Sequence, residues 1–181
     1  MKHLAALLLF CTAVTSIAIP SMKLRDSSGK LVAFKSSNTK PTVLIFVLSD
    51  CPIANNYAPE FGRIMAKYGK NFDIRLIFED PDISLSTAKK HMSDYLLKLP
   101  FLLDPKHKLA RKLEVKFSPE VVILQKGKRI YLGRIDDQYP ELGVRRPEAT
   151  SHDLRDALEA VIHKTAVHQP TAATVGCILP R

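Results

Sequence analysis

Two thiols, those of Cys51 and Cys177, are the side chains best suited to chemistry in this sequence. Cys51 ends the run FVLSDC and precedes Pro52, which is favoured as a first helical residue because its missing N–H would have no partner there. The sequence therefore predicts that Cys51 caps a helix. The free N–H groups and dipole of a helix start stabilise a thiolate and lower the pKa of the thiol, although the charge of Asp50 opposes this effect. Cys51 is thus a candidate nucleophile.

The third thiol, Cys11, lies in a segment that we expect the mature protein to lose. Residues 1–18 join a short basic start to an apolar run that ends in small residues, which is typical of a secretory signal peptide cleaved after Ala18. An uncleaved anchor is the alternative, whereas cleavage would leave no stable membrane span. Export to a periplasmic or extracellular space would place Cys51 and Cys177 in an oxidising compartment, where two thiols can form a disulfide.

Composition restricts the classes of function. The chain has 181 residues, of which 46% are hydrophobic, and this suits the core of one domain. The formal net charge is +9, but the basic residues are scattered and are not interleaved with aromatic ones, so no nucleic-acid partner is predicted. The six histidines lack the spacing of a zinc site and are interpreted as solvated surface residues. Because no Gly-rich loop joins a strand to a helix, we expect no nucleotide cofactor either.

The elements that must position Cys51 alternate between strand and helix. Apolar β-branched runs predict strands, and caps with helical spacing predict helices. The expected elements are strands 30–34, 41–48 and 72–79, helices 52–69 with a kink near Pro59, 84–99 and 106–113, a loop around 101–105, strands 120–125 and 129–135 joined as a hairpin, and a last helix over 151–164. This order predicts an α/β fold, a mixed central sheet with helices on both faces, over residues 19–165. Residues 166–181 form a tail that carries Cys177.

Several motifs resemble those of a known fold. Cys51 at a strand-to-helix turn, Ala58-Pro59 in the following helix and Ser118-Pro119 before a strand are similar to the thioredoxin fold, a three-layer sandwich. More narrowly, CPIANNYAPE, GRIDDQY and GCIL resemble exported bacterial redoxin-domain proteins related to alkyl hydroperoxide reductase and thiol-specific antioxidant. The resemblance implies a nucleophilic role for Cys51. It also implies a cis peptide at Pro119 that presents the backbone of Ser118 to an extended substrate.

The same motif departs from the thioredoxin pattern. Thioredoxins carry C-x-x-C, but Ala54 occupies the place of the second cysteine, so a dithiol cycle within the motif is impossible. Asn55 likewise breaks the C-x-x-x-C spacing of related copper chaperones. Cys177 is the remaining partner for Cys51 within the mature chain. The fourteen residues from Lys164 to Cys177 could span roughly 45 Å, which is enough to cross a small domain.

Peroxidase chemistry has weaker support. Peroxiredoxins place a threonine or serine three residues before the reactive cysteine and a proline further back, where this chain has Leu48 and Leu44. Arg134 is a candidate cation near the thiolate, but we expect it to pair with Asp136 or Asp137 and to order the loop that carries them.

The sequence therefore favours a thiol-disulfide oxidoreductase that uses Cys51 as nucleophile and Cys177 as resolving cysteine. Its partners would be protein or small-molecule thiols and disulfides, with an external reductant. One alternative is a peroxiredoxin-like peroxide reductase or sensor. Another is a non-catalytic binding module in which a bridge from Cys51 to Cys177 is only structural. A free Cys177, or a bridge between two molecules, also stays open at this point.

Overall fold

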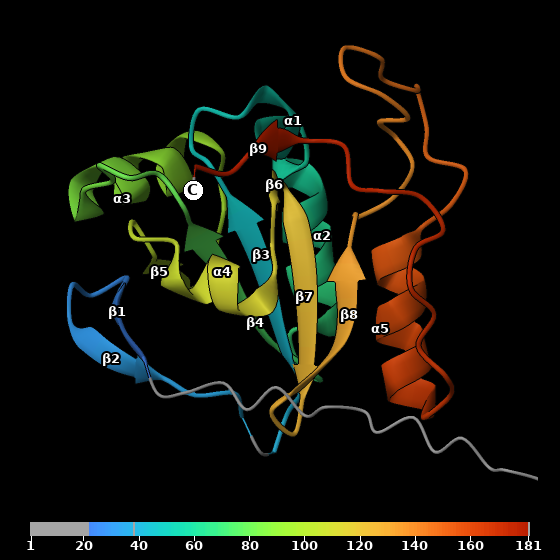
Figure 1. Cartoon of the computed structure of the whole chain (residues 1–181), viewed down its shortest axis with the longest axis horizontal. Coiled ribbons are helices and arrows are strands. Elements are labelled where there is room, and N and C mark those ends of the chain that lie inside the picture. Colours follow the sequence, from blue (N-terminus) through green and yellow to red (C-terminus); the bar gives the residue numbers. More distant parts are fainter. Residues whose placement is uncertain (1–21, 38, 181) are drawn as a thin grey trace, which may run out of the picture.

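The computed structural model describes residues 22–37 and 39–180, so the expected signal peptide and Cys11 lie outside the described residues. A seven-stranded sheet in the order β2-β1-β5-β4-β3-β7-β8 forms the middle layer (Figure 1). Its strands are β1 (Met22–Asp26), β2 (Leu31–Phe34), β3 (Thr42–Val47), β4 (Asp73–Phe78), β5 (Phe101–Leu103), β7 (Glu120–Gln125) and β8 (Lys128–Gly133). The predicted mixed sheet is confirmed.

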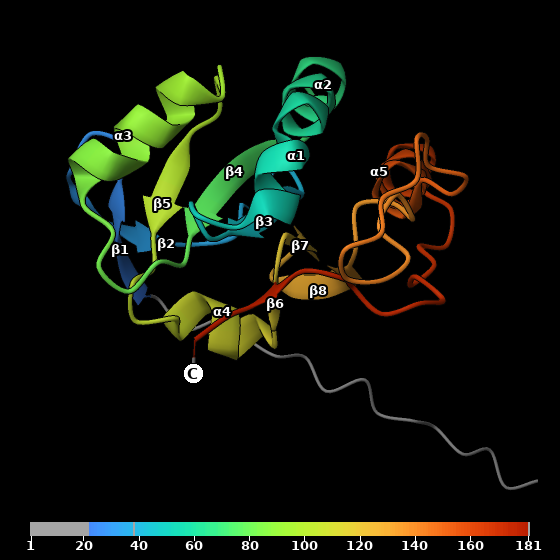
Figure 2. The same cartoon turned by 90° about the horizontal axis from the view of Figure 1, so that it is seen from above.

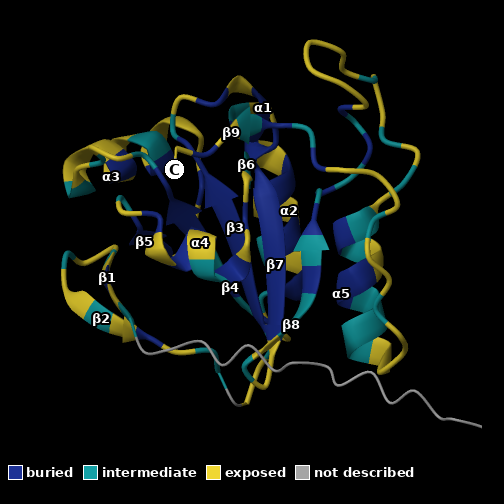
Figure 3. Cartoon of the chain, in the orientation of Figure 1, coloured by how far each residue is buried: buried dark blue, intermediate teal, exposed yellow. Residues whose placement is uncertain are grey.

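The centre of the sheet is parallel and its flanks are antiparallel. Strands β3, β4 and β5 run in the same direction, whereas β7, β8 and β1 run against their neighbours. All six residues of β3 are buried, as expected for a strand that is covered on both faces. The residues of β7 before Gln125 are buried as well (Figure 3). Because parallel strands end at one edge of a sheet, the segments that follow β3, β4 and β5 meet there. Cys51 lies in the first of these segments.

Helices cover both faces of the sheet, which gives the three layers that the sequence predicts. Helices α1 (Pro52–Asn56), α2 (Ala58–Tyr68), α3 (Leu85–Asp94) and α5 (Asp153–His163) lie on one face, and α4 (Lys108–Leu113) lies on the other (Figure 2). A two-stranded ribbon of β6 (Phe117–Ser118) and β9 (Cys177–Ile178) runs beside α4. The expected kink near Pro59 is confirmed, because Tyr57 separates α1 from α2.

Two predictions about the elements were wrong, and one strand was not anticipated. Residues 101–105 were expected to form a loop, but β5 lies between β1 and β4 in the sheet. A strand of three residues is too short to show an alternating pattern, so the sequence gives little sign of it. Strand β1 was not anticipated either, because its sequence MKLRD has three charged residues and only two apolar ones. Helix α3 ends at Asp94, not at residue 99, because Leu96 takes a left-handed conformation with a φ of 54° that a helix cannot continue.

A buried polar cluster occupies the edge where the parallel strands end. Glu79 and Asp104 follow β4 and β5 and are 0% and 1% exposed. The interpretation of His107 as a solvated residue is wrong, because its ring is buried and its Nδ1 lies 2.8 Å from Glu79 Oε2. Burial raises the pKa of Glu79 to about 10, assisted by the charge of Asp104, and burial also lowers the pKa of His107. Both shifts favour a hydrogen bond between neutral groups over an ion pair.

The substitution Glu79→Gln tests this assignment. An ordinary glutamate, with a pKa of about 4.3, loses its proton in the unfolded chain well below pH 7, whereas folded Glu79 keeps it, so the folded state binds more protons and loses stability as pH rises from about 5 to 9. Glutamine cannot ionise, so the stability of the variant relative to the wild type should increase over this range. Denaturant unfolding at several pH values measures the difference. Parallel profiles would contradict the assignment, and Glu148→Gln, at an exposed position, is the control.

Candidate active site

Cys51 lies where the sequence places it, at the start of a helix. It is the residue before α1, with extended backbone angles, and Pro52 is the first helical residue. Asn55 N donates to Cys51 O at 3.0 Å, which closes the first turn. Cys51 is only 1% exposed, whereas Asp50 and Pro52 on either side of it are exposed. The lowered pKa of its thiol stays a prediction.

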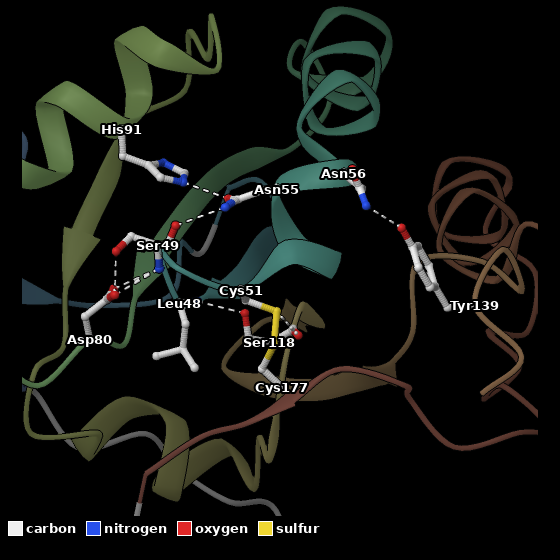
Figure 4. The surroundings of a disulfide bond; sticks show 10 residues. All are labelled: Leu48, Ser49, Cys51, Asn55, Asn56, Asp80, His91, Ser118, Tyr139 and Cys177. Atoms are coloured by element: carbon white, nitrogen blue, oxygen red, sulfur yellow. Dashed lines mark hydrogen bonds between the residues drawn. A yellow bond between two sulfur atoms is a disulfide. The ribbon is translucent and has the colours of Figure 1, made fainter. Parts of the chain in front are cut away.

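Cys51 is bonded to the tail. A disulfide joins it to Cys177 across 126 residues of sequence, with the two Cα atoms 6.0 Å apart (Figure 4). This separation lies in the usual range for bridged cysteines. Ala54, which replaces the second cysteine of the thioredoxin motif, is buried on the inner side of α1. The structure therefore brings the resolving-cysteine candidate to Cys51 from outside the motif.

Ser118 connects the segment that carries Cys51 to the ribbon that carries the tail. The peptide bond between Ser118 and Pro119 is cis, as the resemblance implies. The Ser118 hydroxyl accepts a hydrogen bond from Leu48 N at 2.8 Å, and its carbonyl oxygen lies 3.1 Å from Cys51 Sγ. Ser118 is fully buried. One residue thus fixes the backbone that leads to Cys51 and faces the sulfur itself.

Further polar contacts hold the turn before α1 in place. Ser49 donates from its N and Oγ to Asp80 at 2.9 and 2.6 Å, and Asn55 Nδ2 donates to Ser49 O at 3.0 Å (Figure 4). Because the amide of Asn55 is oriented by this bond, its Oδ1 accepts from His91 Nε2 at 2.9 Å. Burial lowers the pKa of His91, which favours the neutral ring. The expectation that His91 is solvated is therefore wrong.

Arg134 has a different partner from the one expected. Its Nε donates to Asp153 Oδ2 at 2.8 Å, on the first turn of α5, and not to Asp136 or Asp137. Asp136 instead accepts a hydrogen bond from the Tyr57 hydroxyl. The carboxylates nearest in sequence are not the partners of Arg134, because the chain turns after β8 and directs this side chain toward the last helix. Arg134 ties β8 to α5, and a role beside the thiolate has no contact to support it among the described residues.

The tail reaches Cys51 along a defined path. Gln169 uses its side-chain amide as a strand partner for β8, donating to Ile130 O at 2.7 Å and accepting from Leu132 N at 3.1 Å. Thr174 then donates to Glu120 Oε1 at 2.9 Å in a buried contact. Figure 1 shows this segment crossing from the end of α5 to β9. The sequence predicted a tail long enough to cross the domain, but not these anchors, because each one depends on a residue in a distant strand.

Glu120 joins the tail to β6. While its Oε1 accepts from Thr174, its Oε2 accepts from the backbone N of Lys116 at 2.7 Å. The carboxylate is 6% exposed, so it is held between the two segments. Ser118 pairs with Cys177 in the β6–β9 ribbon, and Leu179 N donates to Lys116 O at 2.9 Å beyond it. The last described residues of the chain thus form an ordered strand beside Cys51.

A comparison with protein-family models matches residues 16–131 to the AhpC/TSA family. The chain belongs to this family. The matched residues include Cys51 and Pro119, but α5 and the tail with Cys177 lie beyond them. The disulfide of this redoxin therefore joins the family region to a segment outside it. The comparison with curated proteins gave no match.

Solved structures share the fold. An uncharacterized conserved protein from Geobacillus kaustophilus has a TM-score of 0.74 at 23% identity, covering 90% of this chain and 89% of its own. A hypothetical protein from Sinorhizobium meliloti has a TM-score of 0.72 at 21% identity, covering 88% of this chain and 90% of its own. A putative thiol:disulfide interchange protein DsbE from Chlorobium tepidum has a TM-score of 0.58 at 22% identity, covering 82% and 94%. The redoxin is thioredoxin-like in fold.

Residues 22–37 and 39–180 of this redoxin contain neither a candidate membrane span nor a candidate metal cluster. None of their helices is both long enough and apolar enough to cross a membrane. The same residues contain no group of three or more histidine, cysteine, aspartate or glutamate side chains placed to hold a metal ion.

The substitution Gly176→Ala should loosen the tail. A Cβ at this position would lie 2.4 Å from Ser118 O, a backbone atom that cannot move without disturbing Cys51. We expect about tenfold more of the reduced form at a fixed glutathione potential, because overpacking of ~1.4 kcal/mol acts on the bridged form alone. Alkylation and mass spectrometry measure the ratio. An unchanged ratio would contradict this account, and Gly62→Ala, whose Cβ would meet no atom within 4 Å, is the control.

Proposed function

We propose that this redoxin is a thiol-disulfide oxidoreductase in which Cys51 and Cys177 form the redox couple. The observation that carries the proposal is the bond between these two residues at the start of α1, beside Ser118 and Pro119. Membership of the AhpC/TSA family and the fold shared with a putative thiol:disulfide interchange protein support it. Its substrates would be thiols and disulfides of proteins or small molecules.

In the reduced protein, the Cys51 thiolate attacks one sulfur of a substrate disulfide. The substrate S–S bond breaks, a mixed disulfide with Cys51 forms, and the released substrate sulfur takes a proton from water. The Cys177 thiolate then attacks Cys51 Sγ, which forms the bridge of the structure and releases the second substrate sulfur as a thiol. Two electrons pass from the protein to the substrate. Cys177 replaces the second cysteine that Ala54 removes from the motif.

The return to the reduced form requires a thiol reductant. In the bridged state Cys51 is buried, whereas Cys177 is partly exposed and precedes Ile178, which is 73% exposed. An incoming thiolate therefore attacks Cys177 Sγ, and Cys51 leaves as the thiolate that the helix start stabilises. A second thiolate of the reductant then releases Cys177. The two cysteines thus face different partners: Cys51 meets the substrate and Cys177 meets the reductant.

Peroxide reduction by the same two cysteines is the second candidate, and the family match favours it. The structure provides little assistance to a bound peroxide at this position. Leu48 occupies the place of the peroxiredoxin hydroxyl, and its backbone N is already bonded to Ser118. The polar atom 3.1 Å from Cys51 Sγ is a carbonyl oxygen, which accepts and does not donate hydrogen bonds. Disulfide exchange needs no such donor.

We also propose that the protein is exported, with residues 1–18 removed and with residues 19–165 forming the domain to which the tail, 166–181, is bonded. The apolar start of the chain supports this, as does a disulfide, because such bonds persist in oxidising compartments. One structure with the same fold, 21% identical with a TM-score of 0.53, is a secreted disulfide oxidoreductase of Mycobacterium tuberculosis homologous to DsbE. A periplasmic or extracellular site of action fits the proposed chemistry.

Turnover of a peptide disulfide by purified variants tests the function. All chains carry Cys11→Ser, so that this thiol cannot contribute. With a thiol reductant, Cys51→Ser should fall to the rate of the reductant alone, because the attacking thiolate is lost. In the absence of the reductant, Cys177→Ser should complete one exchange and accumulate a mixed disulfide on Cys51, which peptide mapping locates.

Full turnover by Cys51→Ser would overturn the proposal. Turnover of hydrogen peroxide much faster than of the disulfide would replace it by the peroxidase candidate. Glutathione added to the bridged protein and quenched early provides a further check, since the glutathione adduct should form on Cys177 and leave Cys51 free for alkylation.

A further inference from the structure

The tail occupies the edge of β6 in the manner of a bound peptide. Its strand β9 runs antiparallel to β6, with Cys177 opposite Ser118 and Ile178 opposite Phe117, and its cysteine is bonded to Cys51 (Figure 4). Within the described residues, β9 is the sole partner of β6. When the bridge is reduced and the tail leaves, these backbone groups become an open strand edge beside the thiolate. Such edges bind extended peptides through main-chain hydrogen bonds.

We propose that this edge recognises extended cysteine-containing segments of substrate proteins by the pattern Gly-Cys-x-Leu, and that the tail is its built-in occupant. The proposal rests on the proposed function, because the bound cysteine is the one that Cys51 attacks. It adds a substrate class, defined by the residues around the cysteine. The pattern is taken from how each tail residue meets the rest of the protein.

The residue before the cysteine must lack a side chain. Gly176 lies against the Ser118 carbonyl, and a Cβ there would be 2.4 Å from the oxygen and 2.8 Å from the carbon of that group. Ser118 cannot retreat, because its hydroxyl is bonded to Leu48 N and its oxygen faces Cys51 Sγ. A segment with any larger residue before its cysteine must therefore pair less closely with β6.

The second residue after the cysteine must be apolar. Leu179 is 5% exposed and joins the hydrophobic core, while its backbone N donates to Lys116 O. Ala110 of α4, Val115 and Leu179 line one surface pocket. By contrast, Ile178 between Cys177 and Leu179 is 73% exposed, so the edge does not select at that position. The alternation follows from strand geometry, in which successive side chains point to opposite faces.

Two cavities adjoin the tail where it lies along β6. A cavity of about 540 Å³ lies between the segment around Pro170 to Thr174 and the strand pair at Leu132 and Glu120. A second, of about 380 Å³, lies beside Leu179 and Pro180, against α4. These volumes leave space for a bulkier segment than the tail. A substrate strand can therefore occupy the same edge once the tail has left it.

The tail and a substrate strand compete for the same edge of β6. While a substrate strand is bonded to Cys51 and paired with β6, the tail cannot pair there. To attack Cys51, Cys177 must return along the same edge, so resolution of the mixed disulfide and displacement of the substrate strand occur together. The tail thus competes with the substrate and expels it.

Exchange with tail-derived peptides tests the recognition. The reduced full chain with Cys11→Ser and Cys177→Ser reacts with a peptide of residues 173–180 whose cysteine carries thionitrobenzoate, and release of the coloured thiol reports attack by Cys51. We expect the peptides with Gly176→Ala or Leu179→Ser to react at least about tenfold more slowly than the parent. The matched control peptide, Ile178→Ser, should react within about twofold of the parent, since that side chain faces solvent.

The tail itself supplies a second variant. Gly176→Ala placed in the chain weakens the built-in occupant, so the parent peptide should react faster with that chain than with one that has Gly176. Equal rates for all four peptides would overturn the recognition while leaving the exchange chemistry intact. Failure of every peptide, and of a small aromatic disulfide, to release the coloured thiol would overturn the proposed function and this proposal with it.

Discussion

The position of Ser118 between Leu48 N and Cys51 Sγ is the constraint on which the rest of the site depends. Its hydroxyl accepts a hydrogen bond from Leu48 N, 70 residues earlier in the sequence, in the segment that follows β3. Its backbone is part of β6. Ser118 is buried and its hydroxyl accepts from Leu48 N, so it cannot shift without leaving that N–H unpaired, which is costly in a protein interior. The distance from β6 to Cys51 is therefore fixed, and with it the path of any strand that pairs with β6.

This arrangement changes the character of the redox cycle. In a C-x-x-C protein the two cysteines share one helix turn, and the disulfide opens with little movement. Here Ala54 removes that route, and the partner thiol arrives on a tail held by Gln169, Thr174 and Gly176. Under the proposed function, each change of redox state therefore binds or releases a strand. Access to Cys51, which is 1% exposed in the bridged form, follows the same event.

Local signals in the sequence predicted much of the fold and the centre of the site. The apolar run before Cys51, Pro52 after it and the alternation of elements sufficed for a helix-capping cysteine in a mixed sheet, and the resemblance supplied the cis peptide at Pro119. The partners of Arg134 and His107 could not be predicted, because each lies in an element whose position depends on the tertiary fold. The sequence also left open whether Cys177 bonds to Cys51, stays free or bridges two molecules, because the length of the tail permits the bond to Cys51 but does not require it.

The equilibrium between the bridged and the reduced protein tests the central claim most directly. The full chain is incubated in thiol redox buffers of increasing strength, quenched by alkylation, and the fraction with both Cys51 and Cys177 blocked is measured by mass spectrometry. Structural disulfides have reduction potentials below about −300 mV, whereas the disulfides of thiol-disulfide oxidoreductases have higher reduction potentials. For a redox couple of Cys51 and Cys177 we expect a midpoint above this value. A bridge that persists below it would contradict a redox couple and leave the disulfide a structural link.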